Sequence, residues 1–236
     1  MRELFLCCLA LNLLFLSTPP TLAVSPDQLL SLETFDEETL LTFPKRWQVR
    51  GNTETAHIVY RVMAEGRNQF LHARADQQAI QIGLTYPFAP GKFPLLHWRW
   101  RVTRLPPNAN EAHKDTHDSA AGVYVIFDNQ LLPRIIKYVW STTLPVGARV
   151  QNPLYWRAKI VVLESGAAGL GEWRQETVNV LHDYQTLFGE SPARALGIGL
   201  ATSSSFTRSI AEADYDDFTL LTSQAVSIET ELNKLP

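Results

Sequence analysis

The residues with the clearest chemical potential in this sequence lie in one extended segment, "LLHWRWRV" at residues 95–102. Side chains alternate along a strand, so His97, Arg99 and Arg101 fall on one side and the two tryptophans on the other. Same-side residues in a strand are about 6.6 Å apart, which places the two guanidinium groups in a row. Such a row suits two carboxylates or a chain of sugar hydroxyls. This side of the segment is therefore the first candidate for a ligand-binding face.

Basic and tyrosine side chains of later segments extend this face if their strands lie beside residues 95–102. The resulting surface would be cationic within a weakly acidic protein. The alternative is that the arginines pair with the protein's own acids, each exposed pair contributing about 0.2–1 kcal/mol. An enclosed pair of arginines needs an anionic partner in either case, and the two interpretations differ in whether that partner is a ligand. The candidate ligand-binding residues are His97, Arg99, Arg101, Tyr124, Lys137, Arg157 and Lys159.

Known catalytic motifs do not occur in this sequence. There is no G-x-S-x-G, no H-E-x-x-H, no phosphate-binding loop and no dinucleotide fingerprint, and we assign no catalytic residue. The enzymatic alternative is a polysaccharide lyase or hydrolase on the same face. In that alternative His97 and Tyr124 act as an acid/base pair beside Arg99.

Acidic side chains offer a candidate metal site with a simpler explanation beside it. Asp36, Asp216 and Asp217 meet if the first and last strands pair, and oxygen ligands of this kind suit calcium. The loop at residues 108–121 also carries histidines and aspartates with metal-binding chemistry. We expect exposed acids at the first place and a solvated loop at the second, with Asp118 bracing the start of the next strand. No cofactor is predicted, and a structural calcium ion is the alternative.

The N-terminus and the charge indicate an exported protein. Residues 1–23 combine an arginine, an apolar run and a small-residue pattern ending at Ala23, which is typical of a signal peptide. Both cysteines lie in this segment, so the mature protein depends on its own core. A net charge of −3 argues against a nucleic-acid partner, and no later segment is long and apolar enough to cross a membrane. We expect a periplasmic or secreted location.

Short alternating or β-branched segments separated by glycine and proline predict an all-β fold. We expect a jelly-roll-like antiparallel β-sandwich in one domain, residues 24–222, followed by a tail at residues 223–236. One helix is predicted at residues 180–188, with Asn179 as its N-cap and Gly189 after its last turn. The expected strands are 29–35, 46–50, 57–63, 69–75, 79–84, 95–103, 121–128, 134–140, 156–164, 172–178, 194–202 and 215–221.

Five stretches follow one another in the order seen in a known bacterial family: "LLHWRWRV" (95–102), "HDSAAGVYVIFD" (117–128), "IKYVWS" (136–141), "HDYQTLFGESP" (182–192) and "AEADYDDFTL" (211–220). The chain thereby resembles the family catalogued as domain of unknown function 3047, from residue 30 to 222. This resemblance implies an exported bacterial protein and brings no established activity with it. The ends "LETFDEE" (32–38) and "ADYDDFTL" (213–220) are also loosely similar to the first and last strands of galactose-binding-type jelly rolls.

These observations together predict a ligand-binding protein, with a small molecule or a glycan as its partner. Anionic cell-envelope material is the ligand class that the arginine face suits. A structural envelope protein that binds another protein through an exposed sheet edge is a further alternative. The sequence leaves the oligomeric state open.

Overall fold

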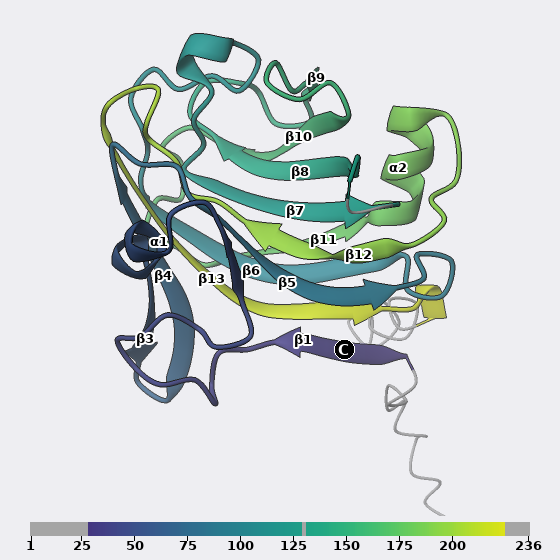
Figure 1. The fold of residues 1–236 in the computed structure, drawn as a ribbon, viewed down its shortest axis with the longest axis horizontal. Coiled ribbons are helices and arrows are strands. Elements are labelled where there is room, and N and C mark those ends of the chain that lie inside the picture. The colour runs from purple at the N-terminus through teal and green to yellow at the C-terminus, as the bar shows by residue number, and fades with distance from the viewer. Residues whose placement is uncertain (1–27, 129–130, 225–236) are drawn as a thin grey trace, which may run out of the picture.

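The computed structural model describes residues 28–128 and 131–224. The predicted signal peptide and most of the predicted C-terminal tail lie outside the described residues. Within these residues the strands form two sheets of a sandwich (Figure 1). Sheet A contains β11 (Arg174–Asn179), β6 (Leu95–Arg104), β13 (Ile210–Leu221), β4 (Asn68–Asp76) and β3 (Tyr60–Glu65) in this spatial order, and β1 (Leu29–Glu33) pairs with β13. Sheet B contains β2 (Gln48–Arg50), β5 (Gln81–Phe88), β12 (Ala195–Leu200), β7 (Ala121–Phe127), β8 (Arg134–Ser141), β10 (Ala158–Ser165) and β9 (Arg149–Gln151).

The core between the two sheets is centred on large aromatic rings. Trp98 and Trp100 of β6 meet Tyr138 and Trp140 of β8, with ring centroids 5.9 Å apart for the first facing pair and 6.2 Å for the second. All four side chains are fully buried. The alternation predicted for residues 95–102 is confirmed, because every second residue of β6 is buried in this layer.

Most of the remaining predictions of secondary structure are also confirmed. Helix α2 (Val180–Phe188) begins after Asn179, whose side chain accepts a hydrogen bond from the His182 amide. It ends at Gly189, which has the left-handed conformation that glycine adopts without strain. Figure 1 shows α2 at one end of the strands and a second helix, α1 (Thr53–Val59), at the other. No helix among the described residues is long and apolar enough to cross a membrane.

Two features differ from the predicted antiparallel sandwich. Residues 57–59 were predicted as the start of a strand but belong to α1, because Asn52 caps a helical turn by accepting a hydrogen bond from the Thr55 amide. Strands β8 and β10 run parallel, so the chain must cross over between them. The crossover contains β9, a strand that the sequence did not predict, which pairs antiparallel with β10.

The crossover between β8 and β10 covers one part of the outer face of sheet B. Its apolar side chains, Leu144, Ala148 and Val150, pack on Val139, Ile160 and Val162 of the sheet. The outer face of the neighbouring strands β5, β12 and β7 lies beside this small apolar cluster. The crossover therefore covers the outer face of sheet B over β8 and β10.

A half-buried carboxyl group, that of Glu176, lies where β11 forms the edge of sheet A. Glu176 accepts a hydrogen bond of 3.1 Å from Nε1 of Trp100. Burial raises the pKa of Glu176 to about 7, and the nearby charge of Glu164 adds to the effect. Folding therefore favours the protonated form of this side chain relative to the unfolded chain.

We predict that the native protein loses stability as the pH rises from 4.5 to 7 and that the Glu176→Gln variant does not show this loss. The folded-state pKa lies above the unfolded value, so the free energy of unfolding falls as the pH rises through this window. Glutamine keeps the acceptor for Trp100 and does not titrate, and it should stabilise the protein at pH 8 by about 1–3 kcal/mol. Denaturant unfolding at several pH values measures this. The exposed Glu172→Gln is the control, and an unchanged pH slope in Glu176→Gln would contradict the prediction.

Candidate functional site

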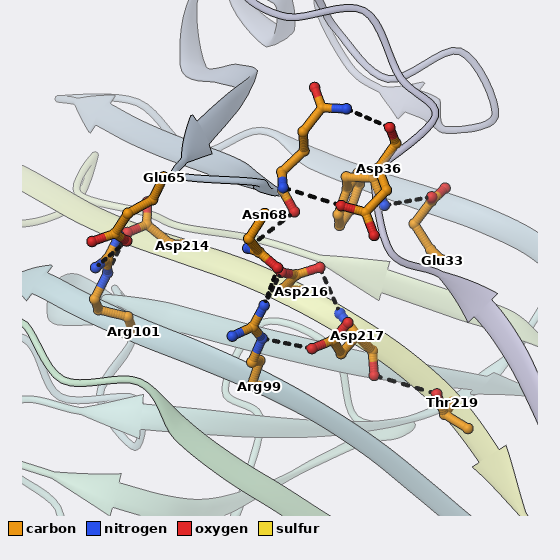
Figure 2. Close-up of polar contacts among 12 residues, drawn as sticks. Glu33, Asp36, Glu65, Asn68, Arg99, Arg101, Asp214, Asp216, Asp217 and Thr219 are labelled. Carbon is orange, nitrogen blue, oxygen red and sulfur yellow. Dashed lines mark hydrogen bonds and ion pairs between the residues drawn. The ribbon is translucent and has the colours of Figure 1, made fainter.

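The arginines of β6 face the protein's own acids on the outer side of sheet A. Nη2 of Arg99 lies 2.6 Å from Oδ2 of Asp216, and its Nε lies 2.6 Å from Oδ2 of Asp217. Asn68 donates a hydrogen bond of 2.9 Å to the same oxygen of Asp216. Figure 2 shows these side chains pointing toward one another from β6, β13 and β4. Burial raises the pKa of Asp216 to about 6, although Arg99 and Asn68 oppose the shift.

A bulge in β13 explains why two consecutive aspartates reach one arginine. Neighbouring residues of a regular strand point to opposite faces, but the register between β13 and β6 shifts between Asp216 and Thr219. Asp217 has a positive φ of 55°, and its amide donates to Oδ1 of Asp216. The backbone therefore returns both carboxylates to the outer face, while Phe218 enters the core.

Arg101 is matched in the same way. Its Nε donates to Oδ2 of Asp214 at 2.8 Å, and its Nη1 donates to Oε2 of Glu65 at 3.0 Å (Figure 2). Both guanidinium groups also stack on Trp173, each 4.7 Å from the ring centroid. The arginine face is consequently an ion-pair network of the protein itself, which was the alternative interpretation of the sequence.

The structure separates the predicted ligand-binding residues into two groups. His97 lies with Arg99 and Arg101 on β6 of sheet A, where its Nδ1 is 2.8 Å from Oγ1 of Thr177. Tyr124 and Lys137 lie on β7 and β8 of sheet B. The outer faces of a sandwich point in opposite directions, so the single surface that we expected does not form. His97 and Tyr124, the acid/base pair of the enzymatic alternative, are not brought together.

Two further predicted residues lie near the second group but have partners of their own. Lys159 donates to Oε1 of Gln151 at 2.7 Å, and Arg157 forms a long ion pair of 3.9 Å with Asp128. Neither of them lines the cavity described below. Of the predicted set, Tyr124 and Lys137 are therefore the residues that a ligand on sheet B could reach.

The candidate calcium ligands engage other groups. The first and last strands pair as expected, with Leu30 opposite Leu220. Asp216 and Asp217 nevertheless bind Arg99, and Asp36 accepts a hydrogen bond from the Gln69 amide. In residues 28–128 and 131–224, no group of three or more histidines, cysteines or acids is placed to hold a metal ion.

The acids and histidines of the 108–121 loop are likewise directed to different partners. Oδ2 of Asp118 accepts hydrogen bonds from the amide and the hydroxyl of Thr207. Asp118 therefore holds the connection between β12 and β13, whereas we expected it to brace the start of the strand that follows it. His117 turns to the Glu111 carbonyl, 2.7 Å from its Nδ1.

A groove runs over the open part of the outer face of sheet B. It consists of two adjoining cavities, of about 400 Å³ and about 530 Å³, which share Arg50 and Pro133 as lining residues. The first cavity contains Tyr124 and Lys137, and the second extends toward the opposite ends of the same strands. We call the two cavities together the sheet-B groove.

Glycines keep the floor of the sheet-B groove low. Gly83 of β5 lies opposite Gly199 of β12, and Gly199 lies opposite Tyr124 of β7. Gly197 also lines the second cavity. Where successive strands lack side chains on one face, a ligand can approach the backbone closely.

The rim of the sheet-B groove combines exposed rings with planar polar groups. Phe206 is 40% exposed, and Tyr155 is fixed by a hydrogen bond of 2.7 Å from its hydroxyl to the Pro133 carbonyl. Arg50 and Gln81 supply hydrogen-bond donors at the sheet edge. Such a combination is typical of ligand sites, which pair apolar surface with a few directed polar groups.

The sequence analysis missed most of this site. Three of its residues, Arg50, Gly83 and Phe206, lie in segments that contain no recognisable motif. They line one groove only because the fold brings distant segments together. One usable signal was present: "ALGIGL" at residues 195–200 places two glycines on one side of a strand. Glycine inside a strand often marks close approach of a ligand or another backbone.

Comparison with known proteins identifies the family. The family model described as "Protein of unknown function (DUF3047)" matches residues 45–219, so the chain belongs to this family. No curated protein matches the chain.

Several solved structures are similar in fold. The Emp47p carbohydrate recognition domain has a TM-score of 0.45 at 10% identity, covering 85% of this chain and 99% of its own. Two carbohydrate-binding modules of cellulosomal cellulases of Clostridium thermocellum are also similar. The family 11 module has a TM-score of 0.40 at 10% identity, and the match covers 84% of this chain and 97% of the module. The family 30 module has a TM-score of 0.41 at 9% identity, and the match covers 82% of this chain and 98% of the module.

We predict that Arg99→Met lowers the free energy of unfolding by about 2–4 kcal/mol, because it leaves the buried carboxylate of Asp216 without its cation. Methionine keeps the apolar contact with Trp173, so the loss reports on charge. Arg74→Met is the matched control at an exposed ion pair with Glu212 and should cost no more than about 1 kcal/mol. Equal losses in the two variants, measured by denaturant unfolding, would contradict a structural role for Arg99.

Proposed function

We propose that this member of the DUF3047 family is a glycan-binding protein and that the sheet-B groove holds the sugar chain. The observation that carries the proposal is the groove itself. It is an open depression over neighbouring strands, with glycine backbone as its floor and aromatic and planar polar side chains at its rim. On the outer face of sheet A, Arg99 and Arg101 are already paired with acids of the protein.

Sugar rings match this surface chemically. A pyranose ring has apolar faces of C–H groups, which pack on aromatic rings, and a rim of hydroxyls, which bond to directed polar groups. Tyr155 and Phe206 supply aromatic rings to the lining of the first cavity, and Trp156, next to Tyr155, is 72% exposed. Arg50 lines both cavities and offers a planar fork of donors to successive sugar units. Exposed apolar surface beside a groove is typical of a binding site.

The proposal includes an extracytoplasmic location. It rests on the signal-peptide pattern of residues 1–23 and on the absence of cysteine from the mature sequence. Glycans of the cell envelope would be accessible to a protein in the periplasm. Detection of the chain in a periplasmic or culture fraction, without residues 1–23, is the direct check.

We predict that Gly83→Leu abolishes glycan binding without unfolding the protein. A Cβ atom at Gly83 would meet only the Ile198 carbonyl oxygen, at 3.5 Å, so the leucine fits the backbone and fills the groove floor. A glycan array of acidic and neutral oligosaccharides identifies the ligands of the native protein, and titration calorimetry then measures a loss of at least about tenfold in the variant.

Gly91→Leu is the matched control for this experiment. Its added Cβ atom would meet nothing within 4 Å, and Gly91 does not line the groove. This variant should bind as the native protein does. Full binding by Gly83→Leu, or no glycan bound by the native protein on the array, would refute the proposed function.

A further inference from the structure

The first cavity is lined by a buried cation, Lys137, that no acid of the described residues contacts directly. Lys137 is only 3% exposed, and its ammonium group donates a hydrogen bond of 2.9 Å to Oγ of Ser119. In the part of the chain that the structure describes, Lys137 forms no ion pair with a carboxylate. Removing an ammonium ion from water without a counter-ion costs several kcal/mol. This cost is comparable with the net free energy of unfolding of a whole domain.

Glu111 is a buried acid that feels the charge of Lys137, but its carboxyl group is hydrogen-bonded to Ser141. Glu111 is fully buried, and its Oε2 accepts a short hydrogen bond of 2.6 Å from Oγ of Ser141. Burial raises the pKa of Glu111, while the charge of Lys137 opposes that shift. Glu111 therefore acts on Lys137 through its charge and through the Ser119 side chain that the two share, without contacting the ammonium group directly.

The described side chains that line the first cavity beside Lys137 include no carboxyl group. Nδ1 of His117 lies 2.7 Å from the Glu111 carbonyl, so this nitrogen must carry the proton and Nε2 is left as an acceptor. Burial lowers the pKa of His117 to about 4, with Lys137 adding to the effect, and the ring is neutral at pH 7. Ser203 and Tyr124 contribute hydroxyls to the same cavity. Glu111, which feels the charge of Lys137, and Asp118, whose charge acts on His117, do not line the cavity, whereas Arg50 does.

The backbone is shaped around this lysine. A Cβ atom at Gly122 would lie 2.8 Å from Cε of Lys137, so a side chain there would displace the lysine from its position across β7. The ammonium group also lies 5.4 Å from the centroid of the Tyr124 ring, within range of a cation–π contact. The lysine is held in place by its surroundings before any ligand arrives.

We propose that Lys137 forms an anion subsite in the sheet-B groove, which selects glycans carrying an acidic group on one sugar unit. The inference rests on the proposed glycan binding and specifies its ligand class. The ammonium group lines the cavity without a carboxyl group beside it there, so the carboxylate of a uronic acid or a sulfate ester can pair with it.

The test compares matched acidic and neutral ligands by titration calorimetry. The probes are uronate-containing oligosaccharides, the same oligosaccharides with their carboxyl groups reduced to alcohols, and sulfated oligosaccharides with desulfated counterparts. The native protein should bind one acidic form at least about tenfold more tightly than its neutral counterpart. The pair that shows the preference tells carboxylate from sulfate.

Lys137→Met removes the charge and keeps most of the stem, and it should bind acidic and neutral forms equally. Lys159→Met is the matched control, since Lys159 is a lysine of sheet B outside the cavity, and it should keep the native preference. Raising the salt concentration provides a second readout without any variant: affinity for the acidic form should fall, and affinity for the neutral form should not.

Three results would overturn the inference. The native protein would bind acidic and neutral forms equally, Lys137→Met would keep the preference, or salt would leave the acidic affinity unchanged. In each of these cases glycan binding itself stands if neutral oligosaccharides still bind in the groove. Absence of binding to every probe and to the array would remove both the subsite and the proposed function.

Discussion

A charged side chain that leaves water must meet an opposite charge, and this constraint separates the two outer faces of the sandwich. On sheet A, Arg99 and Arg101 meet Asp214, Asp216 and Asp217 within ion-pair distance. Both arginines on that face therefore have counter-ions from the protein itself. On sheet B the buried ammonium group has a hydroxyl as its closest partner. Acids of the protein contact the arginines on one face, whereas no described acid contacts Lys137 directly on the other, and this difference is the basis of the proposed anion subsite.

The aromatic core determines which side chains reach each face. Trp98 of β6 contacts Tyr138 of β8 across the core. Because residues of a strand alternate, the neighbours of these rings, Arg99 and Lys137, must point outward on opposite sides of the molecule. The same packing that stabilises the sandwich therefore separates the two cationic groups. No repacking of loops could bring them onto one surface.

Local patterns in the sequence predicted the local structure well. The prediction of the site was wrong because it depended on which strands pair with one another. The alternation of residues 95–102 and the caps at Asn179 and Gly189 involve only near neighbours, and the structure has them as expected. The predicted surface required β6 to lie beside β7, β8 and β10, whereas β6 lies between β11 and β13. Strand order depends on contacts between distant segments, which a single sequence does not display.

The glycine at position 83 gives the strongest indication that the floor of the groove is kept low for a reason other than folding. At Gly197 a Cβ atom would lie 2.1 Å from the Leu84 carbonyl oxygen, so the backbone itself demands glycine there. At Gly83 the nearest contact would be an ordinary 3.5 Å, and alanine would fit. Glycine inside a strand is less stable than alanine by roughly 0.5–1 kcal/mol. Folding gains nothing from glycine at this position, whereas a ligand that lies against the sheet needs the space that a side chain would take.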